Sequence, residues 1–125
     1  MSHDAHELAA ALLPDGSELT VRLADLADAE VALELMHAAF RARPVVGEAP
    51  EALGDDLASV RARIAHGTGY LAFIDGVPAG LVMAARQLGA MRLGRVGVLP
   101  RFREQGIASF LVGVVLEHLA ASGEE

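Results

Sequence analysis

The stretch LGRVGVLPRFREQGIASFLVGVVLEHLA, residues 93–120, decides the fold of this sequence. Residues 95–99 form a short apolar run rich in valine, which is typical of a strand. Pro100 opens a basic turn that extends to Gln105, because proline removes a backbone donor and ends pairing within a sheet. From Gly106 to residue 120, apolar side chains recur at helical spacing and predict a helix with a broad apolar face: Ile107, Phe110, Leu111, Val114, Val115 and Leu119.

A strand, a tight turn and a helix in this order favour the binding of an anion. The first turn of a helix leaves amide N–H groups without partners, and the helix dipole adds partial positive charge there. Phosphate groups bind well at such an end. Arg101 and Arg103 lie just before it and add full charges, while Gly106 and Ala108 leave the backbone accessible. The stretch therefore predicts a site for a phosphate-bearing ligand.

The residues Arg103-Glu104-Gln105-Gly106-Ile107-Ala108 resemble the pyrophosphate loop of the GNAT superfamily of acetyl-CoA-dependent N-acyltransferases, whose pattern is Q/R-x-x-G-x-G/A. The preceding Val96-Gly97-Val98-Leu99-Pro100 resembles the end of that family's fourth strand. Residues 70–82, YLAFIDGVPAGLV, are similar to its second and third strands. The R-x-A-x-x-x-D pattern of residues 22–28 resembles the opening of the family fold. The alternative is an ordinary strand–loop–helix connection that binds nothing.

The resemblance implies an α/β (α+β) domain with a mixed, mainly antiparallel sheet of about four strands flanked by helices. It also implies acetyl-CoA as co-substrate and an acceptor amine on a small molecule or peptide. The pantetheine arm would pair with the backbone of residues 96–98, and the loop would hold the pyrophosphate. The cofactor-binding residues would then be Val96, Gly97, Val98, Arg101, Arg103, Glu104, Gln105, Gly106, Ile107 and Ala108.

The chain stops where the family fold continues with a further strand, a helix and usually two more strands. We therefore expect a single, C-terminally truncated domain, with an N-terminal helix or extension over residues 1–16 and a core over residues 17–125. The chain would be a fragment, a degenerate relative, or a protein completed by a partner. The alternative function is a catalytically inactive module that binds CoA weakly or acts through association. An open edge on the fourth strand would favour a homodimer.

A general base is not visible in the sequence. Many members of the family carry a glutamate on the fourth strand or its neighbour, but residues 90–98 contain no acid. The candidates are Glu34, His37 and Glu48, although the position of His37 favours a structural or surface histidine over a base. The family's general acid, usually a tyrosine, lies in the part that this chain lacks. The only tyrosine, Tyr70, begins a strand and is expected to be structural.

The composition of the chain limits the kinds of partner that it can bind and the cellular location that we expect for it. The net charge of −7 argues against a general nucleic-acid-binding surface, although five arginines and no acid fall between Arg86 and Arg103. No apolar run is long enough to span a membrane. No signal peptide is visible, and the absence of cysteine fits a cytoplasmic protein. His3 and His6 lack supporting ligands, so we expect no metal site.

The remaining elements follow from periodicity and turn residues. A helix is expected over residues 2–13, and Asp25 is expected to cap another over residues 26–41. A third helical region covers residues 50–65, continuous only from residue 54 or 55. Asp75-Gly76 predicts a hairpin turn. The expected strands cover residues 18–24, 70–74, 77–85 and 90–99.

Overall fold

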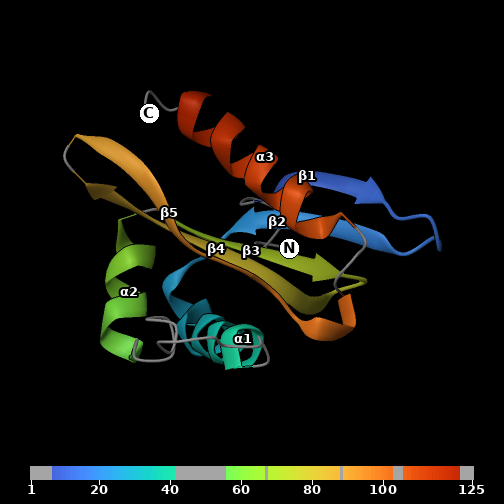
Figure 1. Ribbon diagram of the computed structural model, residues 1–125, viewed down its shortest axis with the longest axis horizontal. Coiled ribbons are helices and arrows are strands. Elements are labelled where there is room, and N and C mark those ends of the chain that lie inside the picture. Colours follow the sequence, from blue (N-terminus) through green and yellow to red (C-terminus); the bar gives the residue numbers. More distant parts are fainter. Residues whose placement is uncertain (1–6, 42–55, 67, 88, 103–105, 122–125) are drawn as a thin grey trace.

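The computed structural model describes residues 7–41, 56–66, 68–87, 89–102 and 106–121. These residues form one antiparallel sheet, in which five strands lie side by side in chain order (Figure 1). The strands are β1 (Glu7–Leu12), β2 (Glu18–Leu23), β3 (Gly69–Ile74), β4 (Val77–Gln87) and β5 (Ala90–Val98). The helices are α1 (Ala29–Arg41), α2 (Leu57–Ala65) and α3 (Ile107–Ala121), with short 3-10 turns η2 (Leu26–Asp28) and η4 (Pro100–Phe102). The α+β class expected from the sequence is confirmed.

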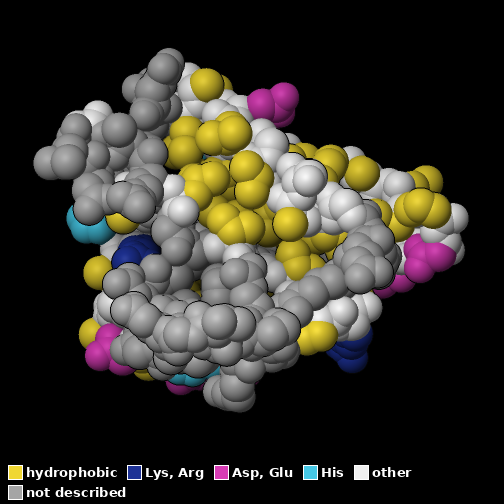
Figure 2. Space-filling view, viewed as in Figure 1, with side chains coloured by type: hydrophobic (Ala, Val, Ile, Leu, Met, Phe, Trp, Pro, Cys, Tyr) yellow, Lys and Arg dark blue, Asp and Glu magenta, His cyan; other side chains and the backbone are white. Residues whose placement is uncertain are grey.

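The sheet separates two layers of helices (Figure 1). α1 and α2 cover one face, where they bury residues such as Leu71 and Leu81 of the sheet. α3 covers the other face and packs over Leu19, Tyr70 and Val82. In the space-filling view, hydrophobic side chains also cover much of the outer surface where α3 lies (Figure 2). α3 is therefore apolar on its sheet-facing side and over much of its outer side.

The expected N-terminal helix is wrong over the residues that the structure describes. Glu7–Leu12 is strand β1, which pairs antiparallel with β2 so that Leu12 lies opposite Glu18. Leu8 and Leu12 are spaced four apart, and this spacing fits one face of a strand as well as one side of a helix. Pairing with β2 decides between the two, and it adds a strand to the four expected. His3 and His6 lie outside the described residues.

The hairpin between β3 and β4 forms at the expected turn. Asp75 and Gly76 both have positive φ, 49° and 82°, as a two-residue type I′ turn requires. Asp75 also connects this hairpin to β2: its N–H donates to the Glu18 carbonyl at 2.9 Å, and its Oδ1 accepts from the Glu18 N–H at 2.9 Å. The turn thus sets the register of three strands.

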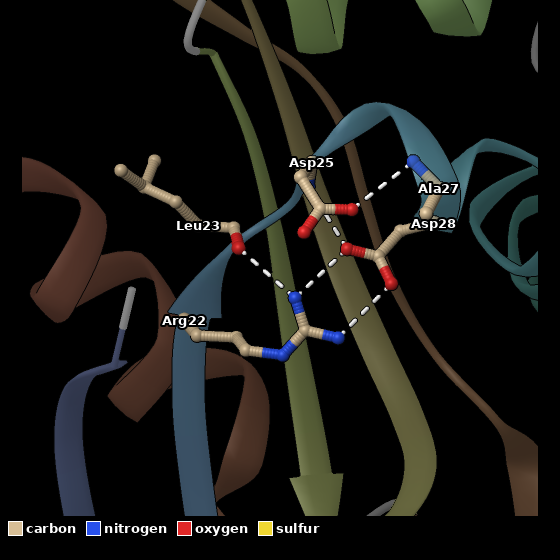
Figure 3. A network of polar contacts seen from close by, with 5 residues as sticks. All are labelled: Arg22, Leu23, Asp25, Ala27 and Asp28. Carbon is tan, nitrogen blue, oxygen red and sulfur yellow. Dashed lines mark hydrogen bonds and ion pairs between the residues drawn. The ribbon is translucent and has the colours of Figure 1, made fainter. Parts of the chain in front are cut away.

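A polar network fixes the start of the first helix (Figure 3). The Arg22 guanidinium donates two hydrogen bonds to the Asp28 carboxylate, at 2.8 and 3.0 Å, and a third to the Leu23 carbonyl at 3.1 Å. Asp28 also accepts from the Asp25 N–H, and the Asp25 side chain accepts from the backbone N–H of Asp28, which makes a capping box. The Asp25 side chain accepts from the Ala27 N–H as well. The R-x-A-x-x-x-D pattern therefore joins the end of β2 to η2 and α1.

Acid should weaken this network. The hydrogen bonds from Arg22 hold the pKa of the Asp28 carboxyl below its usual value of 3.8. A carboxyl with a lowered folded-state pKa stabilises the protein above its unfolded-state pKa, and this contribution is lost as the pH falls through the folded-state value. The free energy of unfolding should therefore fall as the pH drops below about 4. Urea titrations at several pH values across this range measure the effect. In the Asp28→Asn variant, the free energy of unfolding should decrease less steeply with falling pH than in the unaltered chain. Glu30→Gln, at an exposed carboxylate nearby, should keep the slope of the unaltered chain.

Candidate functional site

The candidate site lies where β5 ends and α3 begins. Pairing with β4 continues just past the strand, because the Leu99 N–H donates to the Ala79 carbonyl at 2.8 Å. Pro100 then starts η4, in which the Phe102 N–H donates to the Leu99 carbonyl at 2.9 Å. Val98 and Ile107 are both buried in the core beneath α3. The strand end and the helix start are therefore anchored in one core cluster.

A close approach of β4 and β5 positions the end of the strand. A Cβ added at Gly80 would lie 2.8 Å from the Gly97 carbonyl oxygen and 3.3 Å from Cγ2 of Val98. The first distance is shorter than real Cβ contacts, and a backbone oxygen cannot rotate away. Gly80 is therefore required for the observed spacing of the two strands.

Gly80→Ala should lower the free energy of unfolding by about 1–3 kcal/mol, because the two strands must separate to admit the methyl group. Gly113→Ala is the matched control, since a Cβ there meets nothing within 4 Å. An alanine in the middle of α3 should raise stability by about 0.5–1 kcal/mol, because it removes the entropic cost of glycine. Urea denaturation of the two variants checks this prediction. Equal changes in both would contradict the steric argument.

The first turn of α3 presents backbone donors at the surface. Gly106 has φ of +77°, a conformation that favours glycine, and its carbonyl accepts the N–H of Phe110 at 3.0 Å. The N–H groups of Ile107, Ala108 and Ser109 precede this first intrahelical bond. Ile107 is buried, whereas Ala108 and Ser109 are exposed. Among the described residues, the exposed first turn can therefore offer its N–H groups to an anion.

Arg101 is the described basic residue of the connection. Its side chain is exposed, and its guanidinium carbon lies 4.8 Å from the centre of the Phe102 ring. Phe102 in turn packs against the core beneath α3. Arg103, Glu104 and Gln105 lie outside the described residues. Of the expected loop residues, the structure thus places Arg101 and residues 106–108 at one junction.

Strand β5 is at the edge of the sheet in the described part of the chain, with β4 as its neighbour. Hydrogen bonding alternates along an antiparallel strand. Because the Leu99 N–H points at β4, the N–H and C=O of Gly97 do so as well. The expected pantetheine-binding segment, residues 96–98, therefore belongs to the edge strand of the described sheet and lies directly before the helix start.

Two of the three candidate bases lie on α1. Glu34 is exposed and His37 is half-buried, and both belong to α1, on the opposite face of the sheet from α3. Glu48 lies outside the described residues. α1 does contact β5 across that face. Among the described residues no group of histidines and acids could hold a metal ion, and no described helix is long and apolar enough to cross a membrane.

Sequence reasoning missed a polar contact between the sheet and α3. The Tyr70 hydroxyl lies 3.0 Å from Nδ1 of His118, and the two rings meet edge to face. Burial raises the pKa of Tyr70, so its hydroxyl stays protonated at neutral pH. The expectation that Tyr70 is structural agrees with its complete burial. The available signal was His118 itself, a polar residue four positions after Val114 on the apolar side of the helix.

Known proteins resemble this chain in sequence and in fold. The family model for the acetyltransferase (GNAT) family matches residues 32–125. The PaiA N-acetyltransferase of Thermoplasma acidophilum, in complex with coenzyme A, is 14% identical with a TM-score of 0.69, over 85% of this chain and 74% of that one. A GNAT family acetyltransferase from Brucella melitensis, in complex with acetyl-CoA, is 25% identical with a TM-score of 0.67, over 85% and 71%.

The aminoglycoside N-acetyltransferase AAC(6')-Iy, in complex with CoA, is 22% identical with a TM-score of 0.65, over 91% of this chain and 77% of that one. Other similar chains are much longer: this chain spans 34% of one from Pyrococcus horikoshii and 28% of one from Kribbella flavida. No curated protein matches the sequence. The family match covers well over half of the chain, and the similar structures have the same fold. The chain belongs to the acetyltransferase (GNAT) family.

Proposed function

We propose that this chain binds acetyl-CoA at the junction of β5 and α3 and transfers the acetyl group to an amine of a small molecule or peptide. The observation that carries the proposal is the exposed first turn of α3, where the N–H groups of Ile107, Ala108 and Ser109 precede the first intrahelical bond. Family membership supports it, as do similar structures that hold CoA or acetyl-CoA.

In this proposal the pyrophosphate of the cofactor binds the amides of residues 106–108. Arg101 and Arg103 add charge-assisted contacts, and Glu104 and Gln105 complete the loop. The pantetheine arm lies along residues 96–98, at the edge of the sheet. Each such anchor should contribute on the order of 1–3 kcal/mol to binding.

The transfer forms a bond between the amine nitrogen and the thioester carbonyl carbon, and it breaks the carbon–sulfur bond. The amine must lose a proton, and the departing thiolate of CoA must gain one or be stabilised. The residues that we propose as general base are Glu34, His37 and Glu48. A Glu34→Gln or His37→Gln variant that keeps acetyl-CoA affinity and loses transfer would identify the base. The acceptor stays defined only as an amine.

A second candidate function is a module without transferase activity that binds CoA weakly or acts by association. It is favoured by the place of β5 at the edge of the sheet that the described residues form. An edge strand can pair with a second copy of the chain. This proposal expects a dimer in sedimentation, and a stable monomer at micromolar concentration counts against it. A cytoplasmic location stays a prediction.

Calorimetric titration with acetyl-CoA tests the first proposal. The chain should bind with a dissociation constant in the micromolar range, about −8 kcal/mol, and Arg103→Glu should abolish the signal. Release of the CoA thiol in the presence of amines then tests the transfer itself. The absence of both heat and a thermal shift would mean that the loop is structural. Binding without thiol release from any amine of a broad panel would favour the second function.

A further inference from the structure

The contact between Tyr70 and His118 joins the centre of the sheet to the far end of α3. Tyr70 belongs to β3, between β2 and β4, and its side chain is fully buried. His118 lies in the last turn of α3, eleven residues after Ile107 and thus about 16 Å from it along the axis. The 3.0 Å contact between the hydroxyl and Nδ1 is directional, unlike the apolar packing around it.

The apolar pattern of α3 does little to fix which side of the helix faces the sheet. The buried stripe consists of Ile107, Leu111, Val114, Val115 and Leu119. On the outer side, Leu116 is 54% exposed and Val112 is half-buried. A helix turned by about 100° about its axis would bury these two residues in place of Ile107, Leu111 and Val114, while Val115 and Leu119 would stay near the sheet. The turned helix buries only one aliphatic side chain fewer, so the hydrophobic effect favours the observed setting by about one side chain.

His118 distinguishes the two settings. It follows Val114 by four residues and Val115 by three, so it lies on the buried stripe in the observed setting. In the turned helix it would leave the stripe, and the Tyr70 hydroxyl would lose this partner inside the core. A buried hydroxyl without a partner is unfavourable. The polar pair therefore adds a directional preference for the setting that the apolar residues favour by only about one side chain.

We propose that the Tyr70–His118 hydrogen bond fixes the rotational setting of α3 and thereby positions the N–H groups of Ile107, Ala108 and Ser109. The effect on a ligand rests on the proposed function. A rotation of about 100° at a Cα radius of about 2.3 Å moves each first-turn residue by on the order of 3–4 Å. Hydrogen bonds to a pyrophosphate do not tolerate such a shift. Tyr70 and His118 are positioning residues, at the opposite end of the helix from the proposed ligand.

The chain contains no cysteine, so a single introduced cysteine can report the setting of the helix. One chain carries Leu116→Cys at an exposed position, and another carries Val114→Cys, which replaces a side chain that is 8% exposed. When Tyr70 and His118 are both present, the thiol introduced at position 116 should react with a thiol reagent at least about tenfold faster than the thiol introduced at position 114. Tyr70→Phe, which keeps the ring, should reduce this ratio to about threefold or less. His118→Leu should do the same, and His118→Gln, which keeps a hydrogen-bonding group, should restore most of the ratio.

The affinity for acetyl-CoA is measured in the same variants without the introduced cysteines. Tyr70→Phe and His118→Leu should weaken it by about tenfold, and His118→Gln should recover most of that loss. A reactivity ratio that stays unchanged in both Tyr70→Phe and His118→Leu overturns the proposal. A reduced ratio with unchanged affinity overturns its second half, the positioning of the donors. If the unaltered chain binds no acetyl-CoA, the proposed function fails, and the reactivity ratio alone still decides the setting of the helix.

Discussion

Replacing Ala108 with glutamate is expected to weaken acetyl-CoA binding by about 100-fold, equivalent to about 2.7 kcal/mol. Ala108 is exposed and is the second residue of α3. A carboxylate there would lie beside the N–H groups that we assign to the pyrophosphate, and the two negative charges would repel each other. The same carboxylate interacts favourably with the positive end of the helix dipole, by about 0.3–1 kcal/mol. The stability of the fold should therefore stay the same or rise while binding is lost.

Ala120→Glu is the matched control for this prediction. Ala120 is exposed in the same helix, and the substitution changes the net charge by the same amount. It lies twelve residues farther on, about 18 Å along the axis, so acetyl-CoA affinity should change by less than about threefold. Calorimetric titration and thermal unfolding of both variants give the answer. Equal losses in the two variants would mean that overall charge, and not the first turn of α3, controls binding.

Arg22→Met is expected to lower the free energy of unfolding by about 3 kcal/mol. The side chains of Arg22 and Asp28 are only 17% and 16% exposed, so the substitution leaves a mostly buried carboxylate without its cation. Arg22 also stacks over the Phe73 ring at 4.8 Å, which adds to the loss. Small domains have a total stability of roughly 5–15 kcal/mol, so such a loss is large.

Arg61→Met serves as the control, because Arg61 is exposed on α2 and its replacement should change stability by less than about 0.5 kcal/mol. The double variant Arg22→Met/Asp28→Leu should recover much of the loss, since it removes the uncompensated charge together with its partner. Guanidinium denaturation followed by circular dichroism measures all three variants. A loss below about 1 kcal/mol in Arg22→Met would show that the ion pair behaves as an exposed one.

Elements with local signals were predictable from the sequence. The β3–β4 hairpin follows from Asp75-Gly76, because both residues must adopt positive φ, and α3 follows from its run of apolar spacings. Strand β1 was not predictable, since an alanine-rich stretch with two leucines four apart fits a helix or a strand until β2 pairs with it. The third expected helical region appears as α2, whose N-cap is Asp56, and residues 50–55 of that region lie outside the described residues.

The candidate site also has parts that could be predicted from the sequence and parts that could not. The proposed pyrophosphate loop could be inferred from the sequence because its parts are contiguous, from the end of β5 to the first turn of α3. The partner of Tyr70 could not, because His118 is 48 residues away and only packing of α3 on the sheet brings them together. The acceptor and the base depend on side chains from separate elements, and sequence spacing does not determine their distances.

The most direct test of the account is an amide chemical-shift titration of the ¹⁵N-labelled chain with acetyl-CoA. The account predicts the largest shifts at the amides of Gly106, Ile107, Ala108 and Ser109, with a second group at Val96, Gly97 and Val98. The amides of α2 and of β1 should change little. Shifts concentrated elsewhere, or none at saturating ligand, would contradict the assignment of the β5–α3 junction as the cofactor site.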